Sequence, residues 1–220
     1  SRIDGLFIER AMVRASDTLA ILSAEAPISQ PMMTDGGAFY QLLEEFRQVF
    51  ECSVVDLPRN MLIQHPHLMT DAQVTLVVTE LTLAAARDTI RILSWLKSNA
   101  PQSRVLVVAN RVHPGSPEIS RKDFETSIER KVDVLIPFDL RVGAQAAKLG
   151  KTLAEAAKGS KVGAACIALL DQVLGAGDAG DGATGAAAPR KKGDSLLGKI
   201  GDFRNMMPSR RKAKTAALED

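Results

Sequence analysis

The chain has 220 residues and is 45% hydrophobic, which is enough for one sizeable α/β domain with tails. A formal net charge of +2 is too close to balance to favour nucleic-acid binding on global charge, so any basic surface must be local, and an aromatic content of 4% argues against a base-stacking platform. No apolar run approaches the roughly 18 residues of a membrane-spanning helix, and no signal-peptide layout opens the chain, so we expect a cytoplasmic protein. Cys52 and Cys166 lie in apolar runs, and we expect both to be buried thiols in a reducing compartment.

The first quarter of the chain predicts helix, strand, helix, strand. Apolar spacing favours a short amphipathic helix over Ile3–Val13, and a strand follows at Thr18–Ser23. A loop with proline and glycine then leads to a helix over Ala38–Phe50. The run Cys52–Val55 predicts a buried parallel strand that ends at Asp56.

The middle of the chain predicts three more strands, at Ala72–Thr79, Arg104–Ala109 and Val132–Ile136. Thr82 is a candidate cap for a long helix after the first of them, and Ser120 for a helix before the last. Strands and helices that alternate at this spacing predict an α/β fold with a doubly wound, mostly parallel sheet and helices on both faces.

Helices over Val142–Leu149 and Leu153–Leu174 complete the predicted globular domain, residues 1–174. Residues 175–189 are rich in glycine and alanine and predict a flexible linker. Residues 190–220 form a basic tail that is either a solvated disordered segment or an amphipathic helix for a membrane surface or a partner groove. The apolar face of that helix would consist of Leu196, Leu197, Ile200, Phe203 and Met207.

Polar and proline residues follow three of the predicted strands, and the carboxyl ends of parallel strands converge on one edge of a sheet. The residues are Asp56 with Pro58, Asn110 with Arg111, and Pro137 with Asp139. A carboxylate can hold a magnesium-bound water, an amide can pair with an adenine edge, and a guanidinium or proline ring can cover a base. The set predicts a nucleotide site, although each residue taken singly is also an ordinary turn former.

The runs VVDLPR, VVTELTLAAARDTIRIL, VLVVANRV and VDVLIPFDLRVGAQAAKLGKTLAEAA lie in this order along the chain. Together they resemble the C-terminal two-thirds of a MinD/ParA-type deviant Walker ATPase with a P-loop NTPase-like fold. Within that group they are most similar to the CpaE/TadZ proteins of Flp/Tad pilus assembly. The resemblance covers about residues 1–174.

The resemblance implies a site for ATP and Mg²⁺. It makes Asp56 the Walker B or switch II aspartate, acting on Mg²⁺ through water, and Pro58 the proline that shapes that switch. It makes Asn110 and Arg111 the base-contacting pair, and Pro137 with Asp139 the loop that closes over adenine. It also implies a homodimer that works with the pilus secretion machinery at the inner membrane or cell pole, with no specific nucleic-acid partner.

Two departures from the family pattern bear on activity. Arg59 and Asn60 follow Pro58, where the family usually has a glycine close to the γ-phosphate. No G-x-x-x-x-G-K-[ST] loop or deviant version occurs in the 220 residues, so we expect a fragment that lacks the N-terminal P-loop strand, binds ATP weakly and is inactive alone. The alternatives are a chromosome- or plasmid-partitioning or division-site ATPase, and a noncatalytic scaffold with the same fold.

Overall fold

The computed structural model describes residues 8, 10–23, 29, 35–113, 115 and 118–177. The chain divides into two compact units, Ser1–Gly180 and Asp181–Asp220. All of the second unit lies outside the described residues, as do most of the predicted linker and the whole predicted tail with Leu196, Leu197, Ile200, Phe203 and Met207. The description below concerns the first unit.

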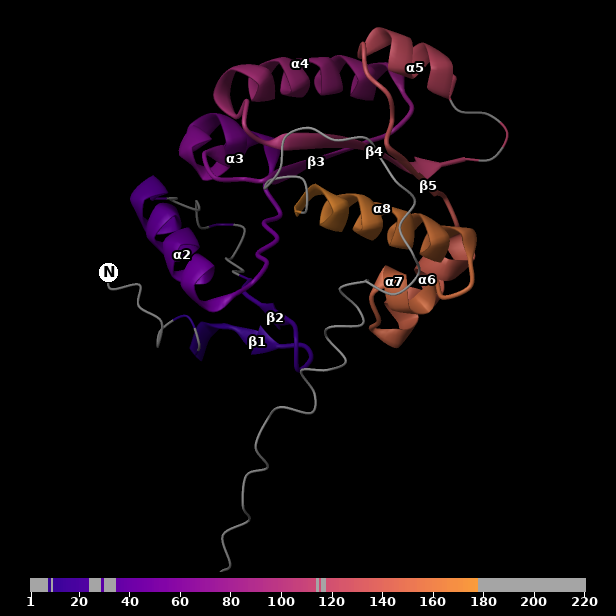
Figure 1. The fold of residues 1–220 in the computed structure, drawn as a ribbon. Helices are drawn as coiled ribbons and strands as arrows, with labels where there is room; N and C mark the ends of the chain where they lie inside the picture. The colour runs from indigo at the N-terminus through magenta and orange to yellow at the C-terminus, as the bar shows by residue number, and fades with distance from the viewer. Residues whose placement is uncertain are drawn as a thin grey trace, which may run out of the picture. The chain divides into compact units, whose positions relative to one another are not determined.

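A three-stranded parallel sheet forms the centre of this unit, in the order β3-β4-β5 (Figure 1). The strands are β3 (Val74–Thr79), β4 (Arg104–Val112) and β5 (Val134–Pro137). Val77 pairs with Val107 and Val108 with Val134, so all three carboxyl ends point the same way. The three strands predicted for the middle of the chain are therefore confirmed, and with them the α/β class.

Helices cover both faces of the sheet. Helices α4 (Leu83–Asn99) and α5 (Arg121–Ser127) lie on one face, and α8 (Lys161–Gly177) lies on the other (Figure 1). The remaining helices are α2 (Gly36–Val49), α3 (Arg59–Gln64), the 3-10 helix η1 (Pro66–Met69), α6 (Leu140–Leu149) and α7 (Leu153–Ala156).

Side-chain caps explain where most of these helices begin. The Thr82 hydroxyl accepts from Ala85 N at 3.1 Å before α4, and the Ser120 hydroxyl accepts from Asp123 N at 3.1 Å before α5, as the sequence predicts. Asp35 and Asp139 cap α2 and α6 in the same way. The single helix predicted over Leu153–Leu174 is interrupted after α7, close to Gly159, whose φ of +78° suits glycine.

Two hydrophobic clusters lie on the α4 side of the sheet. The first joins Phe124 of α5 and Ile128, the residue directly after α5, to Val107 and Ala109 of β4, with Phe124 fully buried. The second joins Leu96 of α4 to Val77 of β3, Leu62 of α3 and Met69 of η1. The sheet and its helices are thus packed around β4, the central strand.

The N-terminal part differs from the prediction. The expected strand Thr18–Ser23 does not join the parallel sheet: β2 (Ala20–Ile21) pairs antiparallel with β1 (Val13–Arg14) in a separate two-stranded sheet. A tight turn causes this arrangement, because Ala15 N and Ser16 N both donate to Leu19 O and fold the chain back on itself. Val13, expected at the end of a helix, lies in β1.

The run Cys52–Val55 also differs from the prediction. It is neither a strand nor buried: Cys52 is exposed, and the Val54 and Val55 side chains are 90% and 53% exposed. The expectation of a buried parallel strand is therefore wrong in this structure. Apolar β-branched residues form a buried strand only where a neighbouring strand pairs with them, and β3 and β4 pair only with each other and with β5 among the described residues.

Candidate functional site

The carboxyl ends of β3, β4 and β5 bring several of the predicted site residues to one rim of the sheet. Asn110 and Arg111 lie near the end of β4, and Pro137 ends β5. Glu80, which was not among the predicted residues, follows β3 at the same rim. This edge is where α/β proteins bind ligands, because loops and helix starts surround the strand ends there. Two pockets lie along it.

A β-bulge at Asn110 and Arg111 shapes this rim. Between the pairs Ala109–Leu135 and Val112–Pro137, β4 has two residues where β5 has one. Arg111 has a φ of +53°, which is unfavourable for a residue with a side chain, and the Asn110 Oδ1 accepts from Arg111 N at 2.9 Å. The bulge turns both side chains toward the rim, and nothing in the sequence pattern indicates it.

The β5 pocket, of about 370 Å³, lies between the end of β4 and the start of α6. Four of the six predicted site residues line it: Asn110, Arg111, Pro137 and Asp139. The rest of its wall is apolar or small, formed by Ile136, Phe138, Leu140, Gly143, Ala144, Leu153 and Val162. An apolar pocket with an amide and a guanidinium at its edge can enclose a flat heteroaromatic ring and hydrogen-bond its rim.

Phe138 is a wall residue that the sequence reasoning did not select. Its backbone N donates to Val112 O at 2.9 Å, and its ring lies 4.4 Å from the His113 ring at an interplanar angle of 32°. The side chain is 38% exposed, so one part of the ring remains open to the pocket and to solvent. The position directly after Pro137 at a strand end was the only signal that could have indicated it.

Asp139 has a structural task in addition to any contact with a ligand. Its Oδ1 accepts from Val142 N at 3.0 Å and caps α6. A carboxylate at a helix N-terminus is favoured by the helix dipole. The cap fixes the direction of α6, which supplies Leu140, Gly143 and Ala144 to the pocket.

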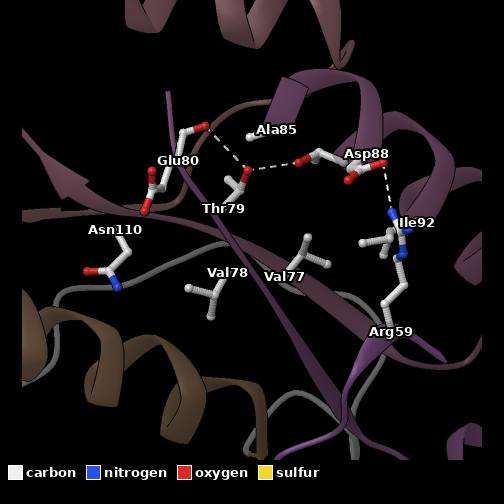
Figure 2. Close-up of a pocket in the computed structure, with 10 residues that line it drawn as sticks. Arg59, Val77, Val78, Thr79, Glu80, Ala85, Asp88, Ile92 and Asn110 are labelled. Atoms are coloured by element: carbon white, nitrogen blue, oxygen red, sulfur yellow. Dashed lines mark hydrogen bonds and ion pairs between the residues drawn. The ribbon is translucent and has the colours of Figure 1, made fainter. Parts of the chain in front are cut away.

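The β3 pocket, of about 340 Å³, lies between β3, α4 and α3 (Figure 2). Arg59 Nη1 lies 2.8 Å from Asp88 Oδ1 and spans its mouth, and the Thr79 and Thr89 hydroxyls form a buried hydrogen bond of 2.9 Å at its wall. Asn110 lines this pocket as well as the β5 pocket. Arg111 Nη1 lies 3.7 Å from Glu80 Oε1, so an ion pair links the two pockets across Asn110.

Asp56 and Pro58 do not join the other predicted residues. Both are exposed, and neither lines the β3 pocket or the β5 pocket. Pro58 precedes α3, and its carbonyl accepts from Met61 N at 2.9 Å. Arg59, the next residue, reaches the β3 pocket, which places the predicted switch segment next to the rim while Asp56 itself remains outside it.

A buried carboxylate beside the amino end of β5, at the opposite end of the strand from the rim, has a strongly shifted pKa. Glu125 of α5 accepts from Lys131 Nζ at 2.8 Å, from Val132 N at 3.0 Å and from Arg121 Nε at 2.8 Å. These donors lower the pKa of Glu125 from 4.5 to about 2. The cluster ties α5 to the segment that enters β5, and so supports the strand that carries Pro137.

The described residues contain no group of three or more histidine, cysteine, aspartate or glutamate side chains able to hold a metal ion. Within the same residues, no helix is long and apolar enough to cross a membrane. His67 Nε2 is 3.0 Å from Gly36 O, a contact that holds η1 against the start of α2.

No family model and no curated protein matches the chain. Several solved structures are similar to it. The ParA family ATPase from Chlorobium tepidum TLS has a TM-score of 0.64 at 17% identity, over 76% of this chain and 69% of that chain. The Pyrococcus furiosus cell division ATPase MinD has a TM-score of 0.64 at 18% identity, over 76% and 70%. The septum site-determining protein MinD from Pyrococcus horikoshii OT3, complexed with Mg-ADP, has a TM-score of 0.62 at 17% identity, over 75% and 68%.

These similarities concern the fold, because the identities are low. They agree with the α/β class, the parallel sheet and the helices on both faces. The chain therefore has the fold of the ParA and MinD ATPases.

Proposed function

We propose that this chain is the nucleotide-binding part of an ATPase of the MinD/ParA type, and that the β5 pocket receives the adenine base. The observation that carries the proposal is the meeting of Asn110, Arg111, Pro137 and Asp139 at one pocket of suitable size. Asn110 would pair with the edge of the base, while Pro137 and Phe138 would cover its faces. The Mg-ADP complex of the Pyrococcus horikoshii MinD supports the same ligand class.

The described residues fit the base better than they fit the phosphates. The 220 residues contain no phosphate loop, and Arg59 at the rim is paired with Asp88. Asp56 is our candidate for holding a magnesium-bound water, but its carboxylate lies outside both pockets. Mg²⁺ usually binds through few carboxylates together with substrate phosphates, so we propose a magnesium role for Asp56 only when phosphates are held there. We assign no hydrolysis to these 220 residues.

The proposal for the base is tested by equilibrium dialysis of labelled adenosine with the unmodified chain and with Asn110→Ala. Loss of one hydrogen-bonding side chain should weaken binding by about tenfold. Asn60→Ala is the matched control, since Asn60 is an exposed asparagine on α3 that lines neither pocket. Equal binding by all three chains would overturn the assignment of the β5 pocket.

The finer cellular role that we propose is Flp/Tad-type pilus assembly and polar localisation, through nucleotide-dependent homodimers that engage the pilus secretion machinery. The support is the similarity of the motifs around Asp56, Asn110 and Pro137 to CpaE/TadZ proteins. In a cell that assembles such pili, deletion of the gene should abolish the pili, and a restored copy should return them. Normal pili in the deletion strain would contradict this role.

We also propose that the basic tail, residues 190–220, contacts an anionic membrane surface. Its basic residues cluster on both sides of Leu196, Leu197, Ile200, Phe203 and Met207, a composition that suits anionic lipid. Sedimentation with vesicles rich in phosphatidylserine should recover the whole chain and lose it when residues 190–220 are removed. Unchanged sedimentation of the shortened chain would remove the proposal.

A further inference from the structure

Two stacked rings lie directly beyond the carboxyl ends of β4 and β5. His113 follows Val112, the last residue of β4, and Phe138 follows Pro137, the last residue of β5. The two ring centroids are 4.4 Å apart at an interplanar angle of 32°. A separation this short at an angle this small indicates contact between the faces of the two rings, rather than between an edge and a face. His113 therefore covers one face of the Phe138 ring.

The bulge in β4 decides which residue lies beside Phe138. Ala109 pairs with Leu135, so regular pairing from that point would bring Val112 beside Phe138. The extra residue in β4 moves Val112 back by one position relative to β5 and brings His113 into that place. The Val112 side chain packs instead against the first hydrophobic cluster. A shift of one residue in register thus replaces an aliphatic side chain beside Phe138 by a flat ring.

The backbone around Phe138 is held on both sides, whereas its side chain is not. The ring of Pro137 fixes its own φ, and Asp139 is held by the hydrogen bond of 3.0 Å that its Oδ1 accepts from Val142 N. The Phe138 side chain is 38% exposed, and a side chain with that much freedom changes rotamer unless a neighbour restrains it. The His113 ring supplies such a restraint.

We propose that His113 is a positioning residue of the β5 pocket, which holds the Phe138 ring in the plane that covers the bound base. This inference rests on the proposed function, because it concerns the pocket that receives the adenine base. His113 does not line that pocket, so it acts through Phe138. The base stacks on the face of Phe138 that His113 leaves uncovered, and the three rings form one stack. A wall that is ordered before binding loses less conformational freedom when the base enters, which raises the affinity.

Equilibrium dialysis of labelled adenosine with three chains tests this role: the unmodified chain, His113→Ala and His113→Phe. We expect His113→Ala to weaken binding about three- to tenfold, and His113→Phe to bind within about twofold of the unmodified chain, because one flat ring replaces another. His67→Ala is the matched control. His67 also packs against a ring, that of His65, but lines neither pocket, so its loss should leave adenosine binding unchanged.

Two further measurements separate positioning from a general effect on the fold. Phe138→Leu should weaken adenosine binding, and adding His113→Ala to it should change the affinity little further, because His113 acts through the ring that is already gone. In NMR spectra of the ligand-free chain, His113→Ala should shift the ring resonances of Phe138, since it removes the adjacent ring. His113→Phe should keep an aromatic ring-current shift on the same resonances.

The outcomes distinguish this inference from the proposed function. The positioning role is overturned if the unmodified chain binds adenosine and His113→Ala binds it equally well. It is also overturned if His113→Phe weakens binding as much as His113→Ala, or if the effects of His113→Ala and Phe138→Leu simply add. In each of these cases the base pocket itself still stands. If the unmodified chain does not bind adenosine, the proposed function fails, and the role of His113 fails with it.

Discussion

Arg111 combines an unfavourable backbone conformation with a position at the proposed base site. A side chain in the left-handed region costs about 1 kcal/mol or more, and such strain is often found at binding sites. The bulge and the hydrogen bond from Arg111 N to Asn110 hold the residue in this conformation. At the scale of single residues, the site is therefore maintained at the expense of local stability.

Two substitutions of Arg111 separate the effect of its guanidinium on binding from the effect of its backbone conformation on stability. Both Arg111→Gly and Arg111→Ala remove the guanidinium, so both should weaken adenosine binding. Only glycine accepts a φ of +53° without strain, so Arg111→Gly should be more stable than Arg111→Ala by about 1 kcal/mol. Urea denaturation of the two variants measures the difference, and equal stabilities would show that the backbone strain is absent in solution.

The lowered pKa of Glu125 leads to a second prediction for a single residue. Its pKa in the folded protein, about 2, is below the ordinary value of 4.5, so its contribution to stability is complete above 4.5 and is lost as the pH falls toward 2. Glu125→Gln should therefore lower the melting temperature near neutral pH, and the gap to the unmodified chain should close across that acid range. Glu129→Gln, an exposed neighbour, is the control. A gap that is the same at all pH values would contradict the shifted pKa.

At the scale of elements, two glycines should respond in opposite ways to alanine. A Cβ at Gly163 in α8 would lie 2.3 Å from Ala157 O, so Gly163→Ala should destabilise the chain by about 1 to 3 kcal/mol. A Cβ at Gly143 in α6 would meet nothing within 4 Å, so Gly143→Ala should stabilise it by about 0.5 to 1 kcal/mol. Thermal unfolding of both variants measures the signs. Destabilisation by Gly143→Ala would contradict the open space around Gly143, and unchanged stability of Gly163→Ala would contradict the close approach of Ala157 to α8.

The elements that could be predicted from the sequence are those set by local chemistry. The caps Thr82 and Ser120 and the apolar runs within β3 and β4 predicted the helix starts and strands that the structure has. Cys52–Val55 has the same kind of composition but is exposed, because a strand also needs a neighbour that no local pattern supplies. The short turn from Ala15 to Leu19 was missed for a related reason: its hydrogen bonds exclude Ala20–Ile21 from the parallel sheet.

The same distinction applies to the candidate site. Strand alternation predicted that the ends of β4 and β5 would meet, and four of the six chosen residues do line one pocket. The bulge at Asn110 and the contribution of Phe138 to the wall of the β5 pocket depend on local backbone geometry. The alternation of strands and helices along the sequence does not encode that geometry. Asp56 was chosen as the tip of a strand, and without that strand its carboxylate lies away from the rim.

At the scale of the whole molecule, the chain has the fold of the ParA and MinD ATPases, with a parallel sheet of three strands at the centre of the described residues. The residues proposed to bind the base are present in this chain, whereas a loop that would bind the phosphates is not found in its sequence. The β5 pocket is formed by β4, β5, α6, α7 and α8, whereas no phosphate loop is present in the 220 residues. An adenine nucleotide should therefore gain little from its phosphates when it binds to this chain.

The most direct test of this account is a comparison of adenosine with ATP by NMR titration of the 220-residue chain. We predict that both ligands shift the resonances of Asn110, Arg111 and Phe138, with dissociation constants that differ by less than about tenfold, because only the base is held. Binding of ATP about a hundredfold or more tighter than adenosine would contradict the absence of a phosphate site. Titrations in which neither ligand perturbs these three residues would contradict the base pocket itself.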